Sequence, residues 1–366
     1  MCTNKRYENN LLNRKRKGKK MQDKTIFEIV DEIKIGWNLG NSFDALPPEN
    51  KETATIKEFE EGWGNPVTTK EMILEVKEAG FNTIRIPVTW WKKTDADNNY
   101  KIDIEWIKRV KEVVDYVYEE GLYVIIDAHH EDEWLVPVEE NLEERKVILA
   151  SIWKQIADFF KDYDYHLIFE TMNEVRLIGT EFEWTEGTKE AREIINTLNA
   201  TAVNAIRSTG GNNYRRPIII PVYGARASDV AINDLEIPND DPNIIITIHA
   251  YHPYFFCMVP NETSVWGTDE EKEDLLNLLD SVSRAAEKKN RPLVIGEFGT
   301  IDKENDTYRA DYIKFYVAEC KKRNIKCIIW DNNRYDTFEW ESFGMFERQK
   351  LRWKNKKIID SLMSAV

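Results

Sequence analysis

The sequence predicts a single α/β domain, a closed (β/α)8 barrel of the TIM type. Short apolar runs alternate with longer amphipathic segments from residue 23 to the end of the 366-residue chain, as in parallel sheets whose strands are covered on both faces. Polar and aromatic residues gather where these runs end, which is where barrels of this type hold their binding sites. A doubly wound open sheet is the alternative with the same alternation.

Eight apolar runs are predicted to be the barrel strands. Each is short and rich in isoleucine, valine and aromatic residues, which favours a buried parallel strand. The runs are 33–41, 83–90, 123–130, 166–174, 217–224, 244–252, 292–299 and 326–332.

The segments between the strands are predicted to be helices with marked ends. Thr68 and Glu71 are expected to form a capping box at the start of the first one, and Gly80 and Gly121 act as stop signals after the first and second. The predicted helices are 70–79, 104–120, 142–160, 190–208, 271–289, 308–323 and 358–363.

The chain divides into a short basic extension and one barrel domain. Residues 1–22 are predicted to be disordered, because residues 1–20 hold eight Lys or Arg against one Glu and few apolar side chains. A nucleic-acid-binding arm is the less favoured interpretation of this run. Residues 23–366 form the predicted barrel, with no linker or second domain inside them.

Charge and composition exclude several classes of protein. The net charge is −14 although the N-terminal run is basic, so the acidic body argues against nucleic acid or an anionic membrane as partner. The four cysteines form neither a disulfide framework nor a zinc motif, and no apolar stretch is long enough to span a membrane. The first residues lack the apolar segment of a secretory signal, and the localisation stays open.

Two glutamates follow apolar strands at what should be one barrel mouth. Glu174 ends the fourth run and Glu297 lies in the seventh. Retaining glycosidases use two carboxyl groups about 5–5.5 Å apart, one as nucleophile and one as acid/base. The sequence therefore favours glycoside hydrolysis over the alternative that either residue is a solvated loop glutamate.

Residues near the two glutamates suit supporting roles. Asn173 can bind a sugar 2-hydroxyl. Arg85 is expected to lower the pKa of the nucleophile, and partial burial is expected to raise the pKa of Glu174. Tyr251 and His249 are expected to orient the carboxyl groups by hydrogen bonds.

The sequence resembles glycoside hydrolase family 5, the barrel family that contains many cellulases, over nearly all of residues 23–366. The matching stretches are 36–44, 80–88, 127–130, 168–174, 249–251, 295–299 and 329–332. The resemblance implies that Glu174 is the acid/base and Glu297 the nucleophile. It also implies that the site of bond cleavage is shaped by Arg85, His129, Asn173, His249, Tyr251 and Trp330.

The resemblance extends to a branch of the family. The run 171–184 together with 331–333 is similar to bacterial endoglucanases, a branch that also includes xyloglucan and mixed-linkage glucan hydrolases. The family usually has proline after its Asn-Glu pair, where this chain has Val175, and we expect this departure to affect only the rigidity of the local loop.

Further residues are expected to bind the sugar chain. The resemblance implies that Trp330 stacks under the sugar before the scissile bond, and Asn38, His130 and Trp134 are also predicted to contact substrate. For the other tryptophans of βα loops, sugar stacking and loop packing are equally compatible with the sequence; these are Trp63, Trp184 and Trp266.

Neither a catalytic metal nor a cofactor is predicted. His129 and His130 are adjacent, so their rings are expected to point in different directions along a strand, whereas zinc needs three or four converging ligands.

Together these features predict a monomeric, retaining endo-β-1,4-glucanase that acts on cellulose-type β-glucans. The alternatives are an endohydrolase of xyloglucan, mixed-linkage glucan, xylan or mannan on the same frame, and a non-catalytic barrel that only binds carbohydrate.

Overall fold

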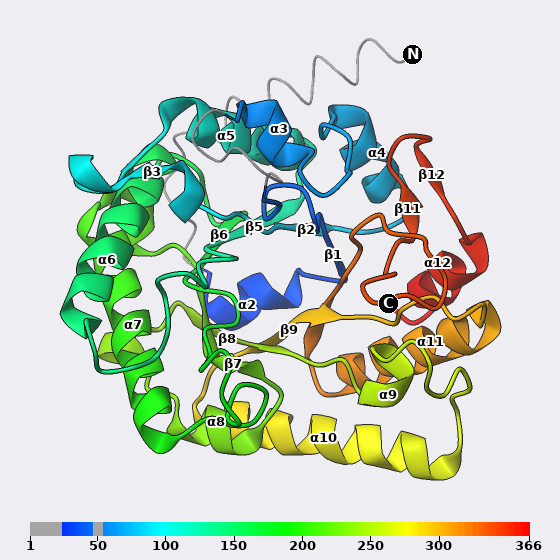
Figure 1. The fold of residues 1–366 in the computed structure, drawn as a ribbon. Helices are drawn as coiled ribbons and strands as arrows, with labels where there is room; N and C mark the ends of the chain where they lie inside the picture. Colours follow the sequence, from blue (N-terminus) through cyan, green and yellow to red (C-terminus); the bar gives the residue numbers. More distant parts are fainter. Residues whose placement is uncertain (1–23, 47–53) are drawn as a thin grey trace.

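The computed structural model describes residues 24–46 and 54–366, and within them the chain forms a closed barrel of eight parallel strands. The order of the strands around the barrel is β1-β10-β9-β8-β7-β6-β5-β2. The helices surround this barrel (Figure 1). The predicted barrel is confirmed, and the open sheet is excluded because β1 pairs with both β2 and β10. The extension expected at residues 1–22 lies outside the described residues.

All eight predicted strands are present, and most are shorter than the apolar runs. Pairing stops where the polar ends of the runs turn into the loops above the barrel. The strands are β1 (Gly36–Asn38), β2 (Thr83–Ile86), β5 (Tyr123–Asp127), β6 (Leu167–Glu170), β7 (Ile218–Arg226), β8 (Ile244–His249), β9 (Leu293–Phe298) and β10 (Lys326–Ile329).

The seven predicted helices are also present, each with ends shifted by at most two residues. They are α4 (Lys70–Glu78), α5 (Ile104–Glu119), α6 (Leu142–Phe159), α7 (Lys189–Ser208), α10 (Asp269–Lys288), α11 (Asp306–Lys322) and α12 (Lys356–Met363). Several short elements were not predicted. They are the helices α2 (Ile26–Asp31), α3 (Ile56–Glu60), α8 (Asp229–Asp234) and α9 (Tyr254–Cys257), and the two-stranded pairs β3 (Thr94–Asp95) with β4 (Lys101–Ile102) and β11 (Phe346–Glu347) with β12 (Arg352–Trp353).

The capping box predicted at Thr68 and Glu71 is wrong. The N-cap of α4 is Thr69, and no side chain caps this helix end. The backbone N–H of Thr68 instead donates to Glu60 on α3, a contact between segments that local sequence cannot reveal. Gly80 does end α4 as expected, with a φ of +116° that favours glycine.

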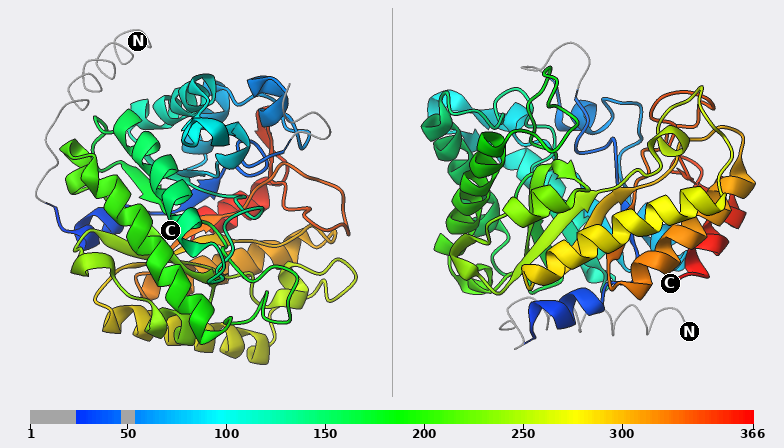
Figure 2. Two further views of the ribbon diagram at one scale, coloured as in Figure 1. Left: turned by 60° about the vertical axis from the view of Figure 1, so that its left-hand side comes forward. Right: turned by 90° about the horizontal axis from the view of Figure 1, so that it is seen from below.

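Two apolar layers hold the barrel together. Outward-facing strand residues such as Val124 and Ile126 pack against the surrounding helices. Inward-facing residues such as Ile125 and Ile168 form a second cluster with α2, which lies across one end of the barrel (Figure 2). The functional loops are therefore left to the other end. Within the described residues, no helix combines the length and the apolar character needed to cross a membrane.

Strand β9 carries one residue more than its neighbours over the same length. Ile248 of β8 pairs with Ile295, but His249 pairs with Glu297, and β10 shows the same offset. Because side chains alternate between the faces of a strand, Glu297 would point outward with Ile295 in a regular strand. The bulge at Gly296 turns Glu297 to the inside of the barrel, as bulges next to binding sites commonly re-aim a side chain.

Substituting Gly296 should test how closely this bulge is packed. A Cβ at Gly296 would lie 2.8 Å from Thr247 Oγ1 and 3.1 Å from His249 Nε2. We expect Gly296→Ala to lower the free energy of unfolding by about 1–3 kcal/mol through overpacking, measured by urea denaturation. Gly299→Ala is the matched control, because its Cβ would meet Phe343 at an ordinary 3.4 Å. Equal stability of the two variants would contradict the proposed packing constraint.

Candidate active site

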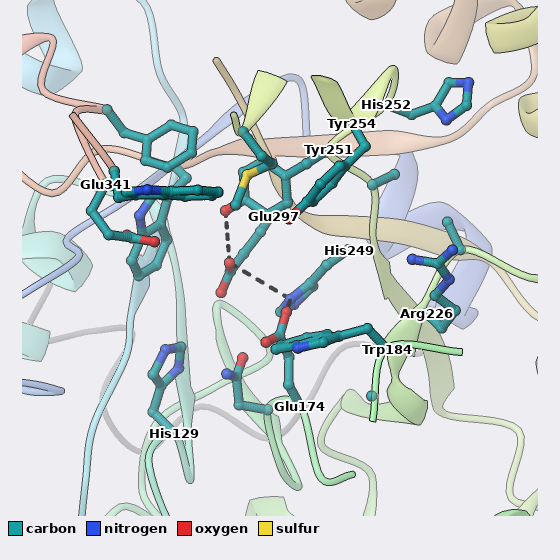
Figure 3. A pocket seen from close by; sticks show the side chains of 18 of the residues that line it. His129, Glu174, Trp184, Arg226, His249, Tyr251, His252, Tyr254, Glu297 and Glu341 are labelled. Atoms are coloured by element: carbon teal, nitrogen blue, oxygen red, sulfur yellow. Dashed lines mark hydrogen bonds and ion pairs between the residues drawn. The ribbon is translucent and has the colours of Figure 1, made fainter. Parts of the chain in front are cut away.

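A cavity of about 1250 Å³ lies over the carboxyl ends of the strands, at the end of the barrel opposite α2. Glu174 and Glu297 both line it, together with His129, His249 and Tyr251. Figure 3 shows the two carboxyl groups at the centre of this cavity, with His249 beside both.

Arg85 on β2 lies below the cavity and is fully buried. Its guanidinium donates to carboxylates on three other strands: to Asp127 at 2.7 Å, to Glu170 at 2.7 and 3.1 Å, and to Glu297 at 2.9 Å. It also donates to the side-chain oxygens of Asn38, at 3.1 Å, and Asn173, at 2.8 Å. A single cation thus joins several strand ends, one of which, at Glu297, lies 212 residues from Arg85 in the sequence.

Glu170 is a site residue that the sequence analysis missed. It lies under the cavity on the inner face of β6, two residues after the inward-facing Ile168. The alternation of the strand was the signal that could have found it, because residues i and i+2 share a face. In the register of the two strands, Glu170 lies opposite Asp127 of β5, a second buried carboxylate.

The carboxyl groups of Glu174 and Glu297 lie close together. An oxygen of Glu174, an oxygen of Glu297 and a ring nitrogen of His249 all lie within 4.8 Å of one another. His249 Nδ1 is 2.6 Å from Glu174 Oε1 and 3.6 Å from Glu297 Oε2, and the hydroxyl of Tyr251 donates to Glu297 at 2.9 Å. The spacing fits two carboxyl groups acting on one atom, and a much wider gap would be needed to seat a water between them.

The pKa directions in this cluster differ from those expected. Burial would raise the pKa of Glu174, but the hydrogen bond and charge of His249 outweigh burial and lower it. Burial raises the pKa of Glu297, against the lowering effects of His249 and Arg85 and with a further rise from Glu174. Arg85 does lower the pKa of Glu297, but burial outweighs this effect.

Burial and the neighbouring carboxylates shift the pKa of His249 in opposite directions. Burial lowers its pKa, but Glu297 and Glu174 raise it by more, so the pKa lies above its ordinary value. Its Nε2 has no hydrogen-bond partner among the described residues and faces β9 at Gly296. The absence of a side chain at Gly296 therefore gives the imidazole the room to sit between the two carboxyl groups.

The two adjacent histidines converge, contrary to the expectation that their rings would diverge. The ring centroids of His129 and His130 are 4.5 Å apart, in an edge-to-face arrangement, and both residues line the cavity. They lie beyond the last paired residue of β5, Asp127, so strand alternation no longer applies to them. His129 Nδ1 is bonded to Asp127 at 2.7 Å.

Trp330 lines the cavity as expected, and its ring is parallel to that of His129 at 5.9 Å between centroids. Glycine at position 40 makes room for it, since a Cβ there would lie 2.7 Å from the indole.

Two residues expected to contact substrate do not line the cavity. Asn38 is fully buried and uses its amide to donate to the carbonyl of Gly296 and to accept from Arg85. Trp134 packs on Trp91 and donates to Glu131. Both belong to the layer that supports the site.

The other loop tryptophans divide between the two options that the sequence left open. Trp63 and Trp184 line the cavity and are partly exposed, whereas Trp266 is buried against Tyr312 and Phe315. Several further lining residues were not predicted: Arg226 at the end of β7, Tyr254 at the start of α9, and Met258, Arg334 and Glu341 outside the regular elements.

The chain is similar to known proteins over most of its length. The family model described as cellulase (glycosyl hydrolase family 5) matches residues 48–336. Endoglucanase A of Clostridium longisporum is 47% identical over 338 residues, which cover 92% of this chain and 65% of the relative. The cellulase/esterase CelE of Acetivibrio thermocellus is 46% identical over 343 residues, which cover 94% of this chain and 41% of the relative. The chain thus spans less than two thirds of the length of these two relatives.

Solved structures resemble the whole barrel. A broad-specificity endoglucanase from Ruminococcus champanellensis, solved with bound cellotriose, superposes with a TM-score of 0.90 at 41% identity, covering 94% of this chain and 100% of that one. A broad-specificity endoglucanase from Clostridium acetobutylicum gives a TM-score of 0.88 at 44% identity, covering 93% and 99%. The strand order, the paired glutamates at the barrel mouth and the family match over most of the sequence lead to one assignment: this chain belongs to glycosyl hydrolase family 5.

Proposed function

We propose that the chain is a retaining endo-β-1,4-glucanase, with Glu297 as nucleophile and Glu174 as acid/base. The observation that carries this proposal is the approach of the two carboxyl groups to within 4.8 Å in one cavity. Retaining glycosidases need such a short separation, because the nucleophile must itself reach the anomeric carbon. The relatives named endoglucanases support the choice of a β-glucan.

In the first step, Glu297 attacks the anomeric carbon and forms a glycosyl ester. The bond between this carbon and the glycosidic oxygen breaks, and Glu174 gives its proton to that oxygen. In the second step, Glu174 takes a proton from water, whose oxygen attacks the same carbon and releases Glu297. Both carboxyl groups then return to their initial states, and no cofactor enters the reaction.

The proton that Glu174 donates resides on the Glu174–His249 pair. In the free site the lowered pKa of Glu174 and the raised pKa of His249 favour an imidazolium beside a carboxylate. A shift of this proton across the 2.6 Å contact from Nδ1 to Oε1 produces the carboxylic acid that the first step requires. A sugar that displaces water from the cavity favours this shift, because a neutral pair costs less to desolvate than an ion pair.

Arg85 and Tyr251 position the nucleophile. Each donates to a different oxygen of Glu297, at 2.9 Å in both cases, which fixes the plane of the carboxylate. Asn173 is held by Arg85 through its oxygen, so its NH2 group faces the cavity and can donate to the sugar 2-hydroxyl.

The two carboxyl groups have different roles, so their removal should give different kinetics. We expect Glu297→Ala to reduce kcat by at least about 10³-fold on every substrate, because no covalent intermediate can form. Glu174→Ala should slow natural β-glucans by about 10²–10⁴-fold but slow aryl cellobiosides with good leaving groups far less, because such leaving groups need no proton. Steady-state kinetics on both substrate classes provide the measurement.

Glu341→Gln is the control for these variants, since Glu341 lines the same cavity but is not hydrogen-bonded to either carboxyl group. Near-native rates for both Glu297→Ala and Glu174→Ala on cellulose derivatives would exclude the assignment.

His249 should set the width of the pH profile. Turnover needs ionised Glu297, whose pKa is raised, and a proton on the Glu174–His249 pair, where His249 has the raised pKa. In His249→Asn the nucleophile Glu297 loses a cation that lowers its pKa, so the acid limb of kcat/KM should move to higher pH. The Glu174–His249 pair loses the imidazole, its more basic group, so the alkaline limb should move to lower pH, by about one pH unit or more.

The measurement is kcat/KM against pH on a cello-oligosaccharide, whose leaving group needs the proton. His252→Asn is the control, because His252 lines the cavity but is bonded to Asp274 and not to either glutamate. An alkaline limb that stays in place in His249→Asn would show that His249 does not hold the proton.

A panel of polysaccharides should define the substrate. One similar structure is described as a xyloglucan-specific endo-β-1,4-glucanase, at 41% identity, and another as a lichenase, at 39% identity. We expect the highest rate of reducing-end release on an unbranched β-1,4-glucan, with a rapid fall in viscosity that marks endo action. Higher activity on xylan or mannan would overturn the β-glucan proposal, and a higher rate on xyloglucan or mixed-linkage glucan would replace the substrate but keep the chemistry.

A further inference from the structure

Asp44, His129 and His130 bring three metal-ligating groups together in the cavity wall. One donor atom of each side chain lies within 4.8 Å of the other two. Two imidazoles and one carboxylate are ligands that suit zinc and neighbouring divalent transition metals. None of the three has a role as proton donor or nucleophile in the proposed reaction.

The ligands of this cluster are held in place by the surrounding protein. His129 Nδ1 is engaged by the Asp127 carboxylate at 2.7 Å, which leaves Nε2 as the free nitrogen. A carboxylate behind a ligating imidazole is the usual arrangement at protein metal sites, where it fixes the ring and raises its basicity. The two oxygens of Asp44 each accept one backbone N–H, from Asn41 at 2.9 Å and Ser42 at 2.8 Å, and both keep free lone pairs.

Aromatic side chains fix the two imidazole rings. Trp330 lies parallel to His129, and Trp63 meets His130 edge-on at 5.5 Å between centroids. Rings that are already ordered lose little conformational entropy when an ion binds, which favours affinity.

The cluster also leaves a coordination position open. Asp44 is fully buried, but His129 and His130 line the cavity, and one third of the His130 side chain is exposed. An ion bound to the three donors would therefore face the cavity with its fourth position. A tetrahedral ion with bonds of about 2.0–2.1 Å needs donors roughly 3.3 Å apart, which small rotations of the side chains can provide.

We propose that Asp44, His129 and His130 bind a divalent transition-metal ion of the zinc type, and that the bound ion inhibits the enzyme by blocking the sugar. Hydrolysis itself needs no metal, so the ion competes with substrate for the two histidines of the cavity wall. The binding half of this inference is independent of the proposed function, and only the inhibition rests on it.

A second cluster, Glu174, His249 and Glu297, meets the same distance limit. Its imidazole Nδ1 is already bonded to Glu174 at 2.6 Å, and Nε2 faces the backbone of β9. An ion would have to break that bond, so the cluster at Asp44 is the stronger candidate.

Calorimetric titration of the full chain with Zn²⁺, after treatment with a chelator, tests the site. We expect one saturable site, with a dissociation constant at least about tenfold larger in His130→Gln. His252→Gln, which removes another cavity-lining histidine, and Glu174→Gln should bind Zn²⁺ as the native chain does. Binding unchanged in His130→Gln, binding lost in Glu174→Gln, or no saturable binding would each overturn the proposal.

The ratio of rates with and without Zn²⁺ gives a second readout that does not depend on the basal activity of each variant. We expect inhibition that a chelator reverses in the native chain and in His252→Gln, and much weaker inhibition in His130→Gln. Thermal unfolding without metal verifies that His130→Gln is folded. Equal inhibition of the two variants would show that the ion blocks the enzyme elsewhere.

Discussion

The Arg85 guanidinium is the interaction on which the site depends. It is buried without access to water, and burying a charge is costly unless it is paired and hydrogen-bonded. This requirement is met by carboxylates of β5, β6 and β9, by the amide of Asn38 at the end of β1, and by the amide of Asn173 after β6. Because the cation needs all of them, it fixes the relative positions of strand ends that the barrel alone only brings near one another.

One cation among three buried carboxylates leaves the cluster short of positive charge. Burial accordingly raises the pKa values of Asp127, Glu170 and Glu297 despite Arg85. His249, which lies beside both Glu174 and Glu297, supplies the missing charge when it is protonated. The imidazole is thus both a structural counter-ion and the store of the proton that the proposed reaction uses, so the protonation of one residue links the stability of the site to its chemistry.

Local sequence was enough to predict the barrel, but not the contacts between residues of different strands and loops. Apolar runs and glycine stop signals are local, so the eight strands, the seven long helices and both glutamates were found from them. The bulge at Gly296 arises from pairing with β8 and β10, and strict alternation would have turned Glu297 away from the cavity. Asn38 was misjudged for the same reason, because its partners Gly296 and Arg85 lie far away in the sequence. Trp134 and the start of α4 were misjudged because they contact neighbouring segments, at Trp91 and Glu60.

The loop after Glu174 shows how the proposed acid/base is tied to the wall of the cavity. Arg176 donates to the carbonyl of Glu174 at 3.1 Å, and its guanidinium lies 4.3 Å from the ring of Trp184. Asp132 and Glu183 hold the same guanidinium at 3.5 and 3.2 Å. With one face of Trp184 covered in this way and the residue also lining the cavity, the indole and the backbone of Glu174 are braced by one cation. A sugar that stacks on this indole would therefore be positioned relative to the proposed proton donor, Glu174.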